Sequence, residues 1–295
     1  MELRHLRYFL AVAQAGNVTK AAEQCFVAQS ALSSQIGRLE AELGSELFLR
    51  STRGMRLTSA GETLRPLASR LLNEAARVEE EMAALRGVVA GRLRLGMIQG
   101  PPAHLYIVEL VAAFHRLHPG VELQVHTGAS EDLARDVLDG LLDLAVVALR
   151  EPSLAATLSV TALIDDPLVA VLSREAGLTP EKAVSVARLL EHGPFIHYRQ
   201  GSGLRRSVTA AFERAGVEVE APFELDQVSD MVRLAMRGVG VTIVPSSVLR
   251  LPQFSDETSF TAVPLADAAA LHTISAVTPD PAAPAAQAFL HLLVA

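Results

Sequence analysis

Residues 19–61 constrain the fold of this chain more than any other segment, because they combine two short helical patterns with a basic hairpin. The second pattern repeats apolar residues at Leu32, Ile36, Leu39 and Leu43, the spacing of a helix that packs one face on a core. A tight turn separates the two helical patterns, and the hairpin follows the second. This order of elements predicts a winged helix-turn-helix at the N-terminus.

The opposite face of the second helix is small and polar near its N-terminus. Gln29, Ser30, Ser33 and Ser34 occupy this face. A recognition helix enters the major groove of DNA with its N-terminal residues leading, so these side chains are predicted to reach base edges. The pattern therefore indicates double-stranded DNA as a partner.

The predicted hairpin carries a cluster of cations, Arg50, Arg53 and Arg56. Cations on such a wing can meet the phosphate backbone or a minor groove. A basic cluster alone is weak evidence, and an ordinary solvated hairpin is the alternative interpretation. Because a helix pair precedes this hairpin, we predict that Arg50 and Arg53 contact DNA.

This N-terminal motif, together with the sequence on either side of it, resembles the LysR-type transcriptional regulators, and the resemblance covers essentially the whole chain. It implies a sequence-specific DNA-binding regulator of overall α/β class. The implied parts are a winged helix-turn-helix, a long linker helix and a two-lobed α/β effector domain similar to periplasmic binding proteins. The landmarks are Leu6 to Phe9, Ala21 with Ala22, Gln29 with Ala31 to Ser33, Leu39 with Glu40, Leu43 with Gly44, Leu47 with Phe48, Arg50, and Leu57 to Gly61.

Two positions in the second helix depart from the family pattern. Ala28 stands where Ser or Thr usually caps the recognition helix, a change that typically lowers stability by about 1 kcal/mol. Gly37 lies inside the same helix, where glycine lowers stability by roughly 0.8 to 1 kcal/mol relative to alanine. We therefore expect a looser helix start than in relatives.

With 295 residues, the chain is long enough for two or three domains. Its longest apolar runs, at 141–149 and 167–172, are short or interrupted by Asp143 and fit buried parallel strands. We expect neither a membrane span nor a secretion signal, which predicts a cytoplasmic protein. The single cysteine, Cys25, agrees with a reducing compartment and is interpreted as a core residue, with a redox sensor as the alternative.

Charge is distributed unevenly along the chain. The formal net charge is −7, which taken alone argues against a nucleic-acid partner. Residues 1–90, however, carry a slight excess of Arg and Lys, and the acidic excess falls on residues 91–295. The charge pattern is therefore compatible with an N-terminal DNA-binding domain.

A long helix is predicted from a capping box at 59–62 to about Val89. Its apolar residues follow one another at steps of three or four from residue 64 to residue 89, with Pro66 near the start. Packing against its own domain is one interpretation. A stripe sustained over more than three heptads favours a seam between two copies, which would make a homodimer with two recognition helices, and relatives suggest a homotetramer.

From residue 91 onward, predicted strands alternate with helices, which indicates open, largely parallel sheets covered by helices. We predict a DNA-binding domain at 1–58, a linker and dimerisation helix at 59–90 and an effector domain at 91–295. Lobe I would comprise 91–162 and 265–295, and lobe II 163–264, with crossovers near Ala162 and Pro264.

The effector is expected where strand ends and helix N-termini of the two lobes face each other, because backbone N–H groups there favour an anion. As a hypothesis, an organic acid binds there, with Arg199 as a bidentate clamp or, equally, as a surface salt-bridge partner. A larger or more apolar ligand is the alternative, because residues 99–102 lack the Ser or Thr hydroxyl that members of the family commonly place at this helix start. The predicted contacts are Gln99, Gly100, Pro101, Thr127, Gly128, Ser130, Arg199, Gly201, Ser202, Gln227, Val228 and Ser229.

An enzyme and an exported solute-binding protein are the competing classes. The glycines at 236–245 lack the third glycine of a dinucleotide fingerprint, and no nucleophile stands beside an evident base. His115, His118 and His126 invite a zinc hypothesis but have no suitable fourth ligand. We therefore predict no catalytic residue, no metal and no cofactor other than the effector, with RNA polymerase as a further candidate partner.

Overall fold

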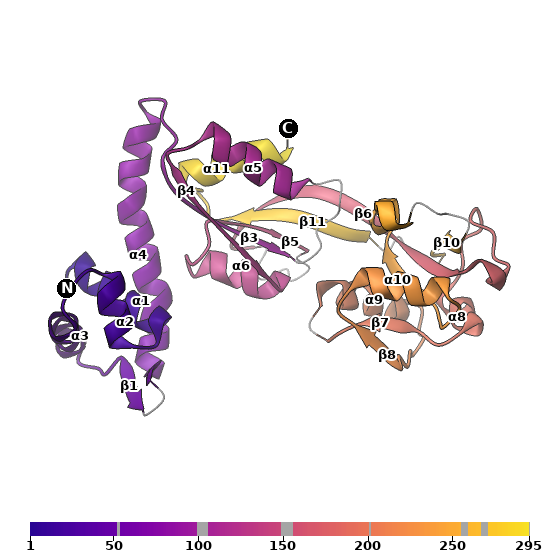
Figure 1. The fold of residues 1–295 in the computed structure, drawn as a ribbon, viewed down its shortest axis with the longest axis horizontal. Helices are drawn as coiled ribbons and strands as arrows, with labels where there is room; N and C mark the ends of the chain where they lie inside the picture. Colours follow the sequence, from indigo (N-terminus) through magenta and orange to yellow (C-terminus); the bar gives the residue numbers. More distant parts are fainter. Residues whose placement is uncertain are drawn as a thin grey trace.

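The computed structural model describes residues 1–51, 54–98, 106–148, 156–200, 202–254, 259–266 and 271–294, with the backbone alone at 50 and 51. Figure 1 shows three parts in chain order: a small helical domain, the long helix α4 and two α/β lobes. Helix α4 lies between the helical domain and lobe I. The whole arrangement agrees with the α/β class predicted from the sequence.

The N-terminal domain is a winged helix-turn-helix. Its core joins Leu6, Phe9 and Val12 of the first helix to the buried face of the third helix, and the rings of Phe9 and Phe48 lie 5.4 Å apart. Asn17 caps the second helix by accepting hydrogen bonds from the backbone of Thr19 and Lys20. The elements are α1 (Leu3–Ala15), α2 (Val18–Gln24), α3 (Gln29–Leu43), β1 (Phe48–Ser51) and β2 (Gly54–Leu57).

Helix α4 (Ser59–Ala84) is the predicted linker helix, with both ends shifted. Its N-cap is Thr58, whose hydroxyl accepts a hydrogen bond from Gly61 N at 3.0 Å, so the capping box predicted at 59–62 was wrong by one residue. The helix continues through Pro66 and ends before the predicted Val89. Gly87, with a left-handed φ of +75°, follows this end, and Val88 N donates to Ala83 O at 3.2 Å, which closes the last turn.

Lobe I has one mixed sheet, in which β3 pairs in parallel with β4 and β5, whereas β11 pairs antiparallel with β5 and β6. Helices α5 and α11 lie above this sheet in Figure 1 and α6 lies below it. The elements are β3 (Gly91–Ile98), α5 (Ile107–Leu117), β4 (Val121–Gly128), α6 (Ser130–Leu138), β5 (Leu144–Val147), β6 (Ser159–Ser173), β11 (Leu271–Thr278) and α11 (Pro284–Val294).

Lobe II packs its helices on the second half of β6 and on a small parallel pair, β7 and β8. A ring contact of 4.9 Å between Phe195 and Phe212 lies in its core. The elements are η2 (Arg174–Ala176), α8 (Val186–Leu189), η3 (Leu190–His192), β7 (Ile196–Tyr198), α9 (Gly203–Arg214), β8 (Phe223–Leu225), α10 (Val228–Met236), β9 (Thr242–Pro245), η4 (Ser246–Arg250), η5 (Pro252–Phe254) and β10 (Phe260–Pro264).

Strand β6 joins the two lobes. It pairs with β11 up to Pro167, and from Leu168 onward it pairs antiparallel with β9 and β10. The prediction of largely parallel sheets was therefore wrong, because alternation of strands and helices does not specify the direction in which a returning strand enters the sheet. The chain returns to lobe I after β10, because β11 pairs with the first half of β6 whereas β10 pairs with the second.

Both apolar runs interpreted as buried parallel strands contain strands, since every residue of β5 is buried and β6 is buried from Ala170 to Leu172. Strand β5 lies parallel to β3, but for the run at 167–172 the predicted direction was wrong, because β6 pairs antiparallel with β9 and β10. Within the parts of the chain that the structure describes, we find no helix with the length and apolar character needed to cross a membrane.

A buried histidine makes lobe II sensitive to acid. His197 on β7 is only 2% exposed, and its Nδ1 accepts a hydrogen bond from Tyr198 N at 2.9 Å. Its Nε2 lies 3.2 Å from Thr209 Oγ1. Burial, with Arg205 nearby, lowers the pKa of His197 to about 4. The ring is therefore neutral in the folded protein at neutral pH.

The unfolded chain takes up a proton on His197 near pH 6.5 and the folded chain only near pH 4, so stability falls as pH decreases through this window. Between pH 7 and pH 5 we expect a loss of about 2 kcal/mol in the free energy of unfolding. Urea titrations at both pH values measure it. His197→Asn retains an acceptor for Tyr198 N and should remove most of the loss; an unchanged loss in this variant would contradict the assignment.

Candidate nucleic-acid interface and effector site

The predicted DNA-reading face of α3 is open to solvent. Gln29, Ser30 and Ser34 are exposed and Ser33 is half-buried. The opposite face, with Leu32, Ile36 and Leu39, is buried in the core of the N-terminal domain. The helix begins at Gln29 after Ala28, which has no side-chain oxygen to cap it. The polar residues picked from the sequence thus form one accessible strip.

The turn between α2 and α3 is held by backbone hydrogen bonds. Phe26 N donates to Glu23 O at 3.1 Å and Val27 N donates to Ala22 O at 3.0 Å, the pairing of a Schellman helix end. At the other end of α3, Glu40 Oε1 accepts from Leu47 N at 2.8 Å. These bonds fix the orientation of α3 on the domain.

The wing rests on the turn after α1. Strands β1 and β2 pair antiparallel from Phe48 with Leu57 to Ser51 with Gly54, and Met55 N donates to Gly16 O at 2.8 Å. A Cβ at Gly54 would lie 2.6 Å from Gly16 O, so only glycine fits there. Arg56 is exposed. Arg53 and the side chain of Arg50 lie outside the described residues.

The lobe I part of the predicted effector site follows the ends of β3 and β4. These strands end side by side, because Ile98 pairs with Gly128. Thr127 is exposed, and Ser130 is buried with its Oγ accepting a hydrogen bond from Ala148 N at 3.1 Å. Ser130 therefore joins the start of α6 to the end of β5. Gln99, Gly100 and Pro101 lie outside the described residues.

The lobe II part follows the ends of β7 and β8. Arg199 N donates to Leu225 O at 3.0 Å, so the segments after the two strands adjoin. Ser202 is the N-cap of α9 and Gln227 the N-cap of α10, with Val228 and Ser229 half-buried in the first turn of α10. Gly201 lies outside the described residues.

The two parts meet at the N-termini of α6 and α9. A Cβ at Gly203 would lie 3.3 Å from Ser130 Oγ, and Arg206 of α9 forms an ion pair with Glu131 of α6. The lobes therefore touch through opposite charges in the first turns of two helices. Neither Arg206 nor Glu131 was among the residues predicted from the sequence. The available signal was the pair Arg205 and Arg206, which closely follows the predicted contact Ser202.

Arg199 forms the surface ion pair that was given as the alternative to an effector clamp. It is 69% exposed and pairs with Asp226 at 3.3 Å on the surface of lobe II. Its neighbour Arg205 donates to Tyr198 O and to Glu224 Oε1, both at 2.6 Å, and so joins β7 to β8. Among these arginines, Arg206 is the one that the structure brings to the other lobe.

Family models match this chain in two adjoining segments. Residues 3–62 match the model described as "Bacterial regulatory helix-turn-helix protein, lysR family", and residues 86–295 match "LysR substrate binding domain". The chain belongs to the LysR family. It is a DNA-binding transcriptional regulator with an effector-binding domain, as the sequence analysis predicted.

Relatives and solved structures agree with this membership. The regulator BudR of Raoultella terrigena is 35% identical over 250 residues, covering 84% of this chain and 86% of BudR. The Escherichia coli regulator YnfL is 30% identical and covers 85% and 84%. Full-length CbnR in complex with its target DNA is 25% identical with a TM-score of 0.61, covering 100% and 99%. A full-length OxyR variant from Pseudomonas aeruginosa has the same fold, with 24% identity, a TM-score of 0.77, and 100% and 93% coverage.

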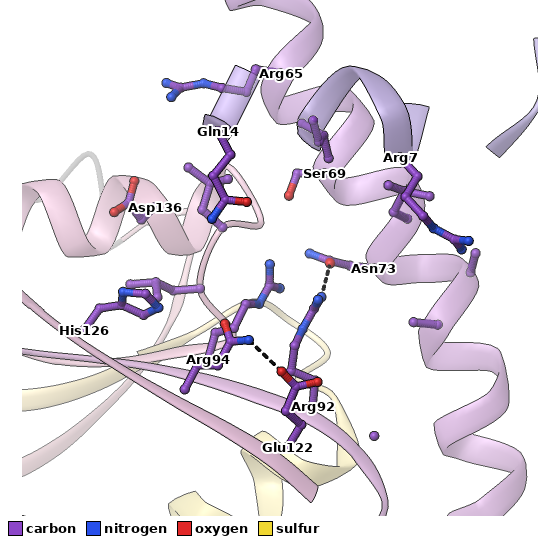
Figure 2. Close-up of a pocket in the computed structure, with 18 of the residues that line it drawn as sticks. Arg7, Gln14, Arg65, Ser69, Asn73, Arg92, Arg94, Glu122, His126 and Asp136 are labelled. Atoms are coloured by element: carbon purple, nitrogen blue, oxygen red, sulfur yellow. Dashed lines mark hydrogen bonds between the residues drawn. The ribbon is translucent and has the colours of Figure 1, made fainter. Parts of the chain in front are cut away.

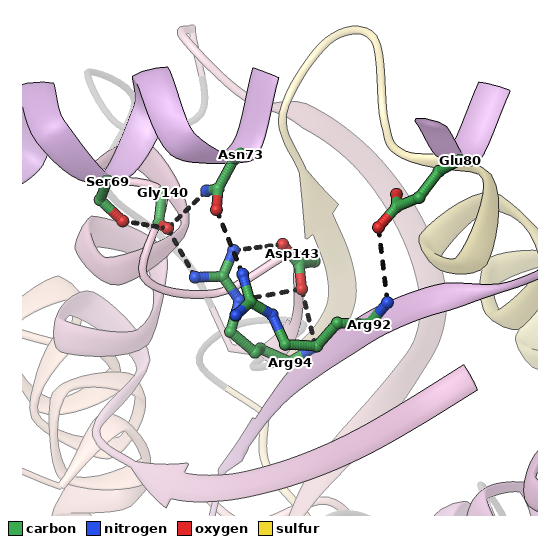
Figure 3. Close-up of polar contacts among 7 residues, drawn as sticks. All are labelled: Ser69, Asn73, Glu80, Arg92, Arg94, Gly140 and Asp143. Atoms are coloured by element: carbon green, nitrogen blue, oxygen red, sulfur yellow. Dashed lines mark hydrogen bonds and ion pairs between the residues drawn. The ribbon is translucent and has the colours of Figure 1, made fainter. Parts of the chain in front are cut away.

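In this LysR-family chain, α4 is attached to lobe I by polar contacts (Figure 3). Ser69 Oγ and Asn73 Nδ2 both donate to Gly140 O at 2.7 Å. Arg94 NH1 donates to the same carbonyl at 2.8 Å. Further along α4, Glu80 Oε1 accepts from Arg92 N at 3.4 Å. Sequence analysis predicted none of these contacts.

Burial perturbs the charged groups of this junction. It raises the pKa of the Glu80 carboxyl and lowers the pKa of the Arg92 guanidinium. Arg94 is only 8% exposed, and its guanidinium forms a bidentate ion pair with Asp143, with Nε 3.0 Å from Oδ2. A paired, hydrogen-bonded charge of this kind orients its neighbours. Lobe I thus presents a prearranged polar surface to α4.

A cavity of about 1430 Å³ lies beside these contacts, between α1 and α4 on one side and β3, β4 and α6 on the other. Figure 2 shows side chains of both charges around it, including Arg7, Arg65, Glu122 and Asp136. The DNA-binding domain therefore faces lobe I across a charged space, and the polar contacts described above hold α4 against lobe I.

Proposed function

We propose that the N-terminal residues of α3 read the bases of the operator. Gln29, Ser30, Ser33 and Ser34 would reach base edges in the major groove, where amides and hydroxyls distinguish base pairs. Arg50 and Arg53 of the wing would contact the backbone or the minor groove. The observation that carries this proposal is the solvent-open polar strip on α3, backed by a buried apolar face.

The exposed face of α4 supports self-association. Val78 is 64% exposed and Leu85 80% exposed, and these join Leu67, Leu71 and Met82 in one apolar stripe. The stripe lies roughly 150° around the helix from the polar residues that bind lobe I. An apolar stripe of this length is stable in water when a second helix covers it. We therefore propose a homodimer through residues 64–89, with pairs of dimers forming a tetramer.

We propose one role for each of the three segments of the chain. Residues 1–58 would bind DNA, 59–90 would link and dimerise, and 91–295 would bind the effector, with lobe I at 91–162 and 265–295 and lobe II at 163–264. The protein would act by binding without turnover, in the cytoplasm where its DNA target lies. RNA polymerase would be its partner at promoters.

The effector is proposed to be a small molecule, an organic acid in the first instance, held between the lobes near the N-termini of α6, α9 and α10. Thermal-shift measurements on the full chain with a panel of mono- and dicarboxylates test this, because stabilisation grows with ligand excess over Kd. We expect one acid to raise Tm by several degrees in the wild type and by less in Arg199→Ala. Equal shifts in both proteins would remove Arg199 from the site.

A DNA titration tests the central function. The full chain is titrated against the DNA that flanks its own gene, and against a scrambled fragment, at several salt concentrations. We expect a preference for the flanking DNA of about 1000-fold near physiological salt, with affinity for both fragments falling as salt rises. Equal binding to both fragments at every salt concentration would contradict specific recognition.

A further inference from the structure

Helix α6 makes functional contacts at both of its ends. Its first turn carries Glu131, which pairs with Arg206 of lobe II. Its last residue is Leu138, and the turn that follows places the carbonyl of Gly140 against α4. Nine residues of helix, about 13 Å, separate the lobe–lobe contact from the contact with the linker helix. Figure 1 shows α6 beneath the sheet of lobe I, on the way from α4 to lobe II.

The contact at the C-terminal end depends on the conformation of one residue. Gly140 has a φ of +70°, a left-handed value that favours glycine, and a Cβ there would lie 2.9 Å from Asn73 Nδ2. The Gly140 carbonyl accepts hydrogen bonds from Ser69, Asn73 and Arg94. Any displacement of α6 along its axis would move this carbonyl and break bonds whose donors are on α4.

The contact surface on α4 is a single stripe. Ser69, Asn73, Arg77 and Glu80 follow at steps of four, four and three, so they share one face of the helix. All four bind lobe I, because Arg77 NH1 also donates to Pro281 O at 3.2 Å. The apolar stripe proposed to hold the second copy lies on the opposite face. A movement of this polar stripe would therefore also shift the apolar stripe, which is proposed to form the dimer seam.

The body of α6 is stiff enough to carry such a movement. Leu133, Ala134 and Val137 are buried against the sheet of lobe I, and a close-packed helix shifts as a unit. The Arg94 and Asp143 pair holds the acceptor end, and Ser130 Oγ holds the other end to Ala148 N. The start of α6 is thus held by Ser130, next to the lobe–lobe contact of Glu131. The turn after its end is held by Arg94, next to the contact of Gly140 with α4.

We propose that α6 couples the distance between the lobes to the orientation of the linker helix α4. A change at the Arg206–Glu131 pair would move α6, and the Gly140 carbonyl would pass this movement to α4. This regulation rests on the proposed function, in which an effector acts between the lobes. An effector that separates Arg206 from Glu131 would release α6 at one end and loosen α4 at the other. Coupling of this kind is reciprocal.

Hydrogen exchange of the full chain, without DNA or effector, tests this coupling through α6. Arg206→Gln removes the input charge from lobe II, and Glu131→Gln removes it from lobe I without changing side-chain size. Each is expected to raise exchange of α4 peptides covering residues 69–80 by about threefold or more, although Arg206 does not touch α4. By reciprocity, Ser69→Ala should raise exchange in the first turn of α9.

The matched control is Arg233→Gln, which removes an exposed ion pair with Asp230 inside α10 of the same lobe. It should leave exchange in α4 unchanged. Unchanged exchange in α4 after both Arg206→Gln and Glu131→Gln would overturn the proposal, and so would an equal rise in the control. A failure of the wild-type chain to select its DNA would count against the proposed function instead, because the exchange experiment contains no DNA.

Discussion

Gln29→Glu is expected to reduce affinity for the operator by at least about 100-fold while leaving the fold intact. The substitution is nearly isosteric, and Gln29 is exposed at the first position of α3. A carboxylate at a helix N-terminus interacts favourably with the helix dipole, so stability should be equal or slightly higher. Against DNA, the same carboxylate loses the amide donor and faces phosphates. A dimer carries the change twice, which multiplies the effect.

Fluorescence anisotropy with operator DNA measures the loss, and thermal unfolding measures stability. Gln24→Glu makes the same chemical change at an exposed position at the end of α2, where Gln24 lines a second hollow together with Glu122 and Gln124 of β4. It should bind the operator about as well as the wild type does. If Gln29→Glu retained wild-type affinity, the assignment of this side chain to the DNA-reading face would be wrong.

Leu71→Glu combined with Val78→Glu is expected to break the α4 seam and so to lower the mass of the assembly in solution. Both side chains are exposed in the single chain, so the protomer should still fold. In a two-helix seam, each carboxylate would be buried without a partner, which typically costs several kcal/mol. Operator affinity should fall by roughly 100-fold or more, because two linked recognition helices gain from effective concentration.

Sedimentation or light scattering at micromolar concentration gives the mass, and anisotropy gives operator affinity. Val239→Glu, which puts a carboxylate at an exposed apolar residue of lobe II, is the control and should keep the mass of the wild-type assembly. A doubly substituted protein that kept the mass and operator affinity of the wild type would show that the α4 stripe does not form the seam.

The N-terminal domain could be predicted from the sequence because its information is local. The period of Leu32, Ile36 and Leu39 fixes which face of α3 is buried, and the same period leaves Gln29 and Ser30 outside. The apolar stripe of α4 could be recognised for the same reason. Helix periodicity thus gave both the DNA-reading face and the proposed seam before any tertiary contact was known.

The lobes were less predictable, because strand direction and partner choice depend on residues far apart in the chain. Nothing in the residues around Pro167 and Leu168 marks the point at which β6 leaves β11 and joins β9 and β10. The apolar runs at 141–149 and 167–172 do contain β5 and part of β6. Strand direction was predicted correctly for β3, β4 and β5 but not for a returning strand such as β11, which adds to the sheet antiparallel.

The effector-site charges show the same limit. Arg199 was selected because it is the formal positive charge among the segments predicted to bind the effector, yet it pairs with Asp226 on the surface, whereas Arg206 reaches Glu131 in the other lobe. The contact of Ser69 with Gly140 joins residues 71 positions apart through a main-chain carbonyl. Every residue has a backbone carbonyl, so the amino-acid sequence does not mark which carbonyl accepts these hydrogen bonds. This junction could therefore be found only in the structure.

Site-directed disulfide trapping tests most directly whether the N-terminus of α3 lies in the major groove. A cysteine is introduced by Ser30→Cys in a Cys25→Ala background, and the operator carries a thiol tethered to a base in the major groove. The account predicts efficient cross-linking of this protein, and none for Ser45→Cys, which places the thiol beyond the other end of α3. Equal cross-linking of both positions, or of neither, would contradict it.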